Sequence, residues 1–230
     1  AIQQYALKMG IDVAAKQYGN LVYDIINYIR RQQHPNLKVH DNGLLFTNGK
    51  ERPATWMNAV ENGWPITPRT GYVVEINALW YNALKFAAEL ATALKSENQA
   101  DLFDYQAGIS GQSLVNKFWN GTYLYDYVDG DYYNKEVRPN MLFAVSLPYS
   151  ALDRKQQKSV VKNVRLGGVQ HYHHRTESHT QKVKQFATDL QEQIQQQQQQ
   201  QQAVEQQVAR TGAVSPYHHH HHTTHQTGGQ

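Results

Sequence analysis

Apolar residues follow helical spacing in several separate stretches of this chain. Residues 12–31 carry them in the i, i+3, i+4, i+7 pattern of one helical face, at positions 18, 21, 22, 25, 26 and 29. Pro35 is expected to end this helix, because the residue before a proline is pushed out of the helical conformation. The same periodicity predicts a second long helix over 75–94, and a third helix is expected over 97–118.

The remaining stretches are short or rich in turn residues. Asn-Gly pairs at 42–43 and 48–49 flank a short apolar run, which predicts a small hairpin or looped excursion. Residues 67–74 are expected to be extended or looped, and the stretch after 119 is too polar for a helix until 141–146. A last short helix is expected over 153–163, with Asp153 near its start. This order predicts an all-α fold of helical hairpins whose loops gather at one end.

Composition changes after Val164. Before it the chain is rich in aliphatic and aromatic residues, whereas Gln, His, Thr and Gly dominate afterwards, with eight glutamines at 195–202 and five histidines at 218–222. Such polar, low-complexity sequence cannot bury enough apolar surface to offset its ordering entropy. We therefore divide the chain into a globular domain, 1–164, and a Gln/His-rich low-complexity tail, 165–230, which resembles biased or artificial sequence.

Charge and cysteine content exclude several classes of function. The net charge is only +3 and Lys and Arg are scattered, which argues against nucleic acid as a partner. The absence of cysteine excludes disulfides and thiolate metal sites and is compatible with a reducing compartment. Histidines at 171–174 and 179 lack a carboxylate partner, so we predict no metal site there. No apolar run is long enough for a membrane span, and the first residues do not resemble a signal peptide.

The first candidate site begins at the stretch TWMNAV, residues 55–60. Sugars present flat C–H faces and several hydroxyls, so a sugar site needs aromatic planes together with charged and amide groups. Such groups are dense here: Trp56, Asn58, Trp64, Arg69, Glu75, Asn77, Trp80, Tyr81 and Asn82. The alternative is ordinary packing with a structural Arg69–Glu75 ion pair, and the residue pattern leaves both open.

A second polar cluster lies further along the chain. The stretch YLYDYVDGD places Asp126, Asp129 and Asp131 in one loop, and Arg138 and Asn140 come just before a helix. Three close carboxylates are typical of a solvated turn or a calcium-like site. The surrounding tyrosines make the wall of a binding groove an equal candidate.

Three stretches in these clusters carry a family resemblance: TWMNAVENGWPITPRTGYVVEINALWYNAL (55–84), LYDYVDG (124–130) and VRPNMLFAVSLPYS (137–150). Over residues 10–164 the chain resembles the C-terminal glucosidase domain of bacterial-type glycogen debranching enzymes, the amylo-α-1,6-glucosidases. The resemblance implies a partial (α/α)6 toroid and a cytoplasmic hydrolase that needs no cofactor. It also implies glycogen or a branched α-glucan as the partner, cleaved at α-1,6-linked glucose.

The resemblance also assigns roles to residues. Inverting hydrolysis needs a carboxylic acid and a carboxylate base about 6.5–9.5 Å apart. The family motif T-W-M-D places its acid where this chain has Asn58, and an amide cannot deliver a proton to a leaving oxygen. The base is expected after Val164, where the tail stands instead. Glu75, Asp126 and Asp129 are alternative acids, and the implied substrate contacts are Trp56, Arg69, Trp80, Asn82, Asp126, Arg138 and Asn140.

Two rival hypotheses follow from these departures. The chain is either a catalytically silent α-glucan-binding module, or a truncated fragment whose helices cannot close the toroid and whose exposed apolar faces drive aggregation.

Overall fold

The structure, a computed structural model, describes residues 1–212, except for the side chains of 168–187, 190, 191, 193, 194 and 197. The chain separates into two units, Ala1–His171 and Tyr172–Gln230. The first unit holds the helices and strands discussed below, and only the last helix continues into the second.

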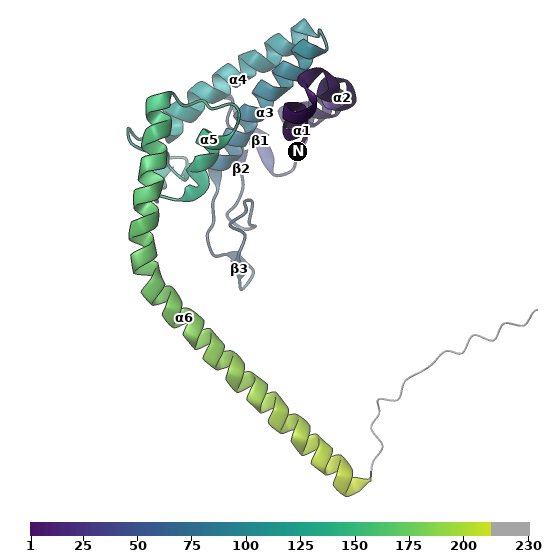
Figure 1. Cartoon of the computed structure of the whole chain (residues 1–230), viewed down its shortest axis with the longest axis vertical. Coiled ribbons are helices and arrows are strands. Elements are labelled where there is room, and N and C mark those ends of the chain that lie inside the picture. Colours follow the sequence, from purple (N-terminus) through teal and green to yellow (C-terminus); the bar gives the residue numbers. More distant parts are fainter. Residues whose placement is uncertain (213–230) are drawn as a thin grey trace, which may run out of the picture. The chain divides into compact units, whose positions relative to one another are not determined.

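Four helices form the larger part of the first unit: α1 (Ile2–Met9), α2 (Ile11–Arg30), α3 (Val74–Ala93) and α4 (Glu97–Phe118). Helix α3 packs against α2 and against α4 (Figure 1). The three long helices confirm the periodicity, and their apolar faces meet in a core that includes Ile26, Trp80, Leu84 and Phe103. The fold is therefore predominantly helical, as expected.

The expectation of an all-α fold is nevertheless incomplete, because the same unit contains a five-stranded antiparallel sheet. Its order is β1-β2-β5-β6-β7. The strands are β1 (Leu37–Val39), β2 (Leu45–Thr47), β5 (Gly71–Val73), β6 (Tyr127–Asp129) and β7 (Tyr132–Tyr133). The hairpin predicted at Asn42-Gly43 joins β1 to β2 and is confirmed. Strands of two or three residues are too short to show an alternating pattern, so sequence periodicity missed the sheet.

Two residues lock the sheet to the start of α3. Gly71 has a φ of 88°, and a Cβ at this position would lie 2.4 Å from the carbonyl oxygen of Val128 on the neighbouring strand. Asn77 is fully buried; its side chain accepts a hydrogen bond from the Leu45 N–H and donates to the carbonyls of Leu45 and Val73. The segment between residues 69 and 77 is therefore held between the sheet and the helices.

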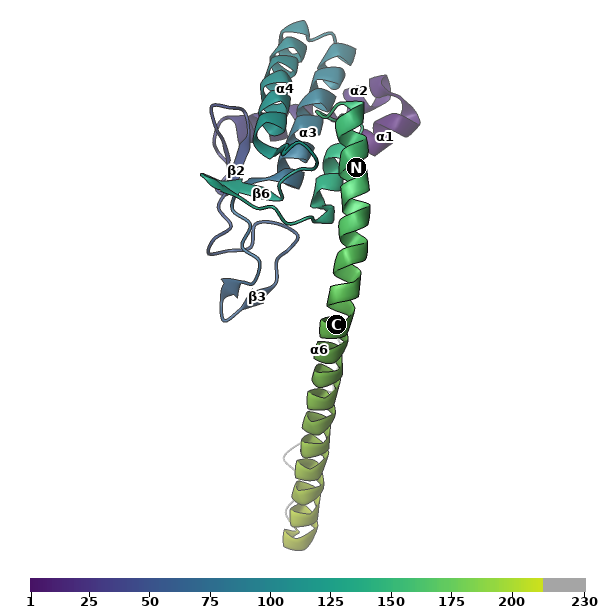
Figure 2. The same cartoon turned by 90° about the vertical axis from the view of Figure 1, so that its left-hand side faces the viewer.

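A second, two-stranded sheet consists of β3 (Val60–Glu61) and β4 (Trp64–Pro65). Asn62 and Gly63, which connect them, both have positive φ, as two-residue hairpin turns require. This hairpin extends away from α3 and α4 in both views (Figures 1 and 2). It belongs to the same loop as the TWMNAV stretch.

The C-terminal elements are η1 (Pro139–Leu142), α5 (Phe143–Ser146) and α6 (Arg154–Thr211). Helix α6 begins where predicted: the Asp153 carboxylate accepts the Gln156 N–H, and the Gln156 side chain accepts the Asp153 N–H. The expected end near 163 is wrong, since α6 continues to Thr211. Gln, Lys, Arg and Glu are good helix formers, so composition alone did not stop it. None of the helices described is long and apolar enough to cross a membrane.

Candidate functional site

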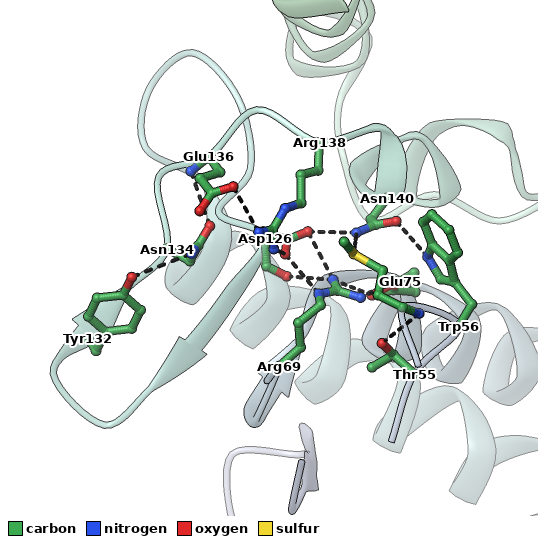
Figure 3. A network of polar contacts seen from close by, with 11 residues as sticks. Thr55, Trp56, Arg69, Glu75, Asp126, Tyr132, Asn134, Glu136, Arg138 and Asn140 are labelled. Carbon is green, nitrogen blue, oxygen red and sulfur yellow. Dashed lines mark hydrogen bonds and ion pairs between the residues drawn. The ribbon is translucent and has the colours of Figure 1, made fainter. Parts of the chain in front are cut away.

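The sheet brings residues from three distant segments into one buried network (Figure 3). Arg69 lies two residues before β5, Glu75 lies in the first turn of α3, and Asp126 directly precedes β6. Because β5 and β6 pair with Val73 opposite Tyr127, the start of α3 lies beside the start of β6. The Val74 N–H donates to the Asp126 carbonyl at 3.1 Å, which fixes this arrangement.

Arg69 is the centre of the network. Its Nη1 and Nη2 donate to Glu75 Oε2 and Oε1, both at 2.6 Å, and its Nε and Nη2 donate to Asp126 Oδ2 and Oδ1 at 2.8 and 2.9 Å. Arg69 is 2% exposed. Burial lowers the pKa of the Arg69 guanidinium, but the hydrogen bonds that Arg69 donates to Glu75 and the charge of Asp126 outweigh it, so the pKa lies above its usual value.

The two buried carboxylates of the network are matched by two arginines. Arg138 donates from Nη1 to Asp126 Oδ2 and from Nη2 to the exposed Glu136 carboxylate. Two buried or half-buried arginines thus face the buried carboxylates of Glu75 and Asp126. Paired charges of this kind avoid the desolvation penalty of an isolated buried ion.

These contacts limit what the two carboxylates can do chemically. Both oxygens of Glu75 accept from Arg69, and both oxygens of Asp126 accept two donors each, from Arg69, Arg138 and Asn140. With every oxygen already occupied by a donor, neither carboxylate has an oxygen left over to contact a ligand. The contacts of Glu75 therefore favour the ion-pair interpretation of this residue.

Asn140 connects the network to the exposed TWMNAV loop. Its Nδ2 donates to Asp126 Oδ1 at 2.8 Å, and its Oδ1 accepts the indole N–H of Trp56 at 2.7 Å. Trp56 is 62% exposed, so its N–H is held while much of the ring faces outward. Asn58, two residues further along, is exposed as well. A tethered indole plane near the exposed amide of Asn58 is suited to stacking on a sugar ring.

Other predicted site residues lie elsewhere. Trp80 is 4% exposed and belongs to the core between the helices, which is ordinary packing. Asn82 donates to Gln3 of α1 and accepts the N–H of Tyr149, so it belongs to a separate polar cluster. Asn77 holds β2 and β5, as described above. The structure therefore brings together Trp56, Arg69, Glu75, Asp126, Arg138 and Asn140, but not Trp80 or Asn82.

The carboxylates of the acidic loop form no cluster that could hold a metal ion. No group of three potential metal-binding side chains occurs there. Asp129, a predicted alternative acid, pairs with Lys50 at 3.6 Å. The histidines at 171–174 and 179 lie outside the described side chains.

Sequence reasoning missed Asn134 and Glu136. Asn134 is buried; its carbonyl accepts the Asp126 N–H and its side chain accepts the Glu136 N–H. Both residues precede Arg138 in the stretch YNKEVRPN. An acidic and a basic residue two positions apart, Glu136 and Arg138, were the sequence feature that could have indicated their ion pair.

The part of the chain that holds this network matches a known family. A family model described as amylo-alpha-1,6-glucosidase matches residues 1–182, which include every residue of the network and the exposed loop. No curated protein matches the chain.

Proposed function

From the premise that this chain belongs to the amylo-alpha-1,6-glucosidase family, we propose that it is a glycogen-debranching-type glycoside hydrolase domain. Its substrate is α-1,6-linked glucose at the branch points of glycogen or a related α-glucan. In this chain the hydrolysis of unactivated substrate is impaired, because Asn58 occupies the position of the family acid.

Trp56 and its neighbours support the binding half of the proposal. The indole is exposed, yet its N–H is fixed by Asn140, which is in turn fixed by Asp126. A stacking platform that is already oriented loses less rotational freedom when a sugar binds. Arg69 and Glu75 act here as the support of the platform, and Arg138 completes the charge balance.

The second half of the proposal, that hydrolysis is impaired, is supported by the surroundings of the carboxylates. This observation carries the proposal. Glu75 and Asp126 are buried and neutralised by arginine, and the exposed Asn58 has an amide in place of a carboxyl group. A positioned general acid contributes about 10²–10⁴-fold to rate. A loss of that order is expected for release of a sugar whose leaving oxygen needs a proton.

The remaining parts of the proposal concern architecture and location. The helical hairpins α1–α2 and α3–α4 form part of an (α/α)6 toroid, with the glucosidase part ending near 164 and the tail following. We place the domain in the cytoplasm, because the family implies glycogen as the substrate.

Two substrates with different leaving groups test the proposal. Fluoride leaves without a strong acid but still needs a base to activate water. A chain extended beyond Val164 to the full length of the family, which supplies the expected base, should therefore hydrolyse α-glucosyl fluoride but release little glucose from a branched limit dextrin. Asn58→Asp should then raise release from the dextrin by about 10²–10⁴-fold and change fluoride hydrolysis little. Equal dextrin cleavage by both forms would show that position 58 is not the acid.

A catalytically silent glucan-binding module is the second candidate, and the saturated carboxylates favour it. In that case neither substrate is cleaved by either form, while limit dextrin still binds. Trp56→Ala should weaken that binding, whereas Tyr105→Ala, at an equally exposed aromatic on α4, should not. Calorimetric titration of limit dextrin into the full chain measures both.

A further inference from the structure

A groove of about 560 Å³ lies along the first turns of α6 and is separate from the site described above. Four cationic side chains of α6 line it: Arg154, Lys158, Lys162 and Arg165. They recur every three or four residues, so they form one stripe along the helix. At 1.5 Å per residue the stripe is about 16 Å long.

These four cations are not paired with a carboxylate among the residues that the structure describes. Within the described part of the chain, none of them forms an ion pair or a side-chain hydrogen bond, and all four are exposed. Like charges at i, i+4 destabilise a helix by about 0.2–0.5 kcal/mol per pair. An anionic partner would remove this repulsion.

The groove also has an apolar side. Val145 of α5 lines it together with Val161 and Leu166 of α6, which are 37% and 56% exposed. A ligand that fits must therefore carry both carboxylates and apolar groups along its length. None of the described residues that line the groove is aromatic, so these residues offer no plane on which nucleic-acid bases could stack.

We propose that this groove, the α5–α6 groove, is a docking site for an acidic amphipathic helix of a partner protein. Such a helix repeats its glutamates at i, i+4 and i+8, the same spacing as Arg154, Lys158 and Lys162 on α6. Its leucines, beside the glutamates, contact Val145, Val161 and Leu166. This is the helix-in-groove mode of recognition with charge complementarity added.

The test uses the full chain and a fluorescein-labelled helical peptide about as long as the stripe. The peptide has glutamates at i, i+4, i+8 and i+11, with leucines beside them. Fluorescence anisotropy should show saturable binding that weakens as salt rises, because exposed charges are screened. The double substitution Lys158→Glu/Lys162→Glu should weaken binding by about tenfold or more.

One control variant, one further test variant and one check of folding complete the experiment. The variant Lys8→Glu/Lys16→Glu changes the net charge equally at exposed positions away from the groove, and should bind as the original chain does. Val161→Asp should weaken binding, because it places an acid among the apolar contacts. Circular dichroism confirms that each variant is folded.

The proposal is overturned if a scrambled peptide of the same composition binds equally well, since attraction would then be unspecific. It is also overturned if both charge variants bind alike, or if oligothymidine of matching charge binds more tightly than the peptide. None of these results depends on whether the domain cleaves or binds glucan.

Discussion

The arginine network and the TWMNAV loop lie side by side and share Asn140, yet they are built in opposite ways. In the network, Arg69, Glu75 and Asp126 are at most 5% exposed, and each charge has a partner of opposite sign. In the loop, Trp56 is 62% exposed and Asn58 is exposed. Polar residues that the sequence places in one group thus separate into a supporting layer and an accessible layer.

This difference in burial and pairing indicates which side chains can contact a ligand without unfolding the domain. A charge of the network that turned toward a sugar would leave its partner buried and unpaired, which costs several kcal/mol. The exposed indole and amides of the loop carry no such cost. Substitutions in the two layers should therefore separate stability from binding.

The largest effect is expected from Arg69→Met. Removing the guanidinium leaves Glu75 and Asp126 buried without their main partner, so the free energy of unfolding should fall by about 3–5 kcal/mol. Urea denaturation followed by circular dichroism measures this. Lys85→Met is the matched control, because the exposed Lys85–Asp104 pair should contribute only about 0–1 kcal/mol. A similar, small loss in both variants would contradict a supporting role for the network.

An intermediate effect is expected from Asn140→Ala, because the Asn140 side chain connects the two layers. Asp126 loses one donor and Trp56 loses its acceptor, so the free energy of unfolding should fall by about 1–3 kcal/mol. Binding of limit dextrin should weaken in the same variant, as the indole loses its orientation. If stability fell but dextrin binding were unchanged, Trp56 would not be the platform.

A smaller effect on stability is expected from Trp56→Phe. The ring keeps a flat apolar face, but the N–H that donates to Asn140 is lost. The free energy of unfolding should therefore fall by about 0.5–1.5 kcal/mol. Dextrin binding should fall less than in Trp56→Ala. Equal binding losses in the two variants would indicate that the hydrogen bond, rather than stacking, determines binding.

The smallest effect concerns pH and a residue outside both layers. Burial of Tyr149, followed by its hydrogen bond to Glu89, raises the pKa of its phenol to about 12. A raised folded pKa stabilises the protonated form, so this contribution is complete below about pH 10 and is lost as pH rises through about 12.

Tyr149→Phe should therefore remove a dependence of the denaturation midpoint on alkaline pH. Midpoints of the original chain and the variant should differ below about pH 10 and converge as pH rises from about 10 through about 12. Tyr105→Phe, on an exposed ring, serves as the control. A constant difference at every pH would show that ionisation of Tyr149 is not linked to folding.

The sequence predicted the long helices well because each helix has one apolar face and one polar face. Helices α2, α3 and α4 begin and end within a residue or two of the expected limits, since apolar positions repeat every three or four residues over five or more turns. The sheet was missed because strands such as β5 and β7 have only two or three residues. The end of α6 was missed because the residues after 163 are themselves good helix formers.

For the site, sequence reasoning found the residues but not their grouping. Trp56 and Trp80 carry the same chemistry, and only packing reveals that one is exposed and the other belongs to the core. Asn134 and Glu136 were missed because their contacts depend on how the chain folds back after β7.

The sequence was enough to predict helices α2, α3 and α4, the family and the amide at position 58, since these depend on local pattern or on residue identity. The tertiary structure alone decided which carboxylates are neutralised and which indole is accessible. The reason is distance along the chain: Arg69 meets Asp126 across 57 residues, and Trp56 meets Asn140 across 84. Contacts of that span form only when the strands pair, and no local pattern encodes them.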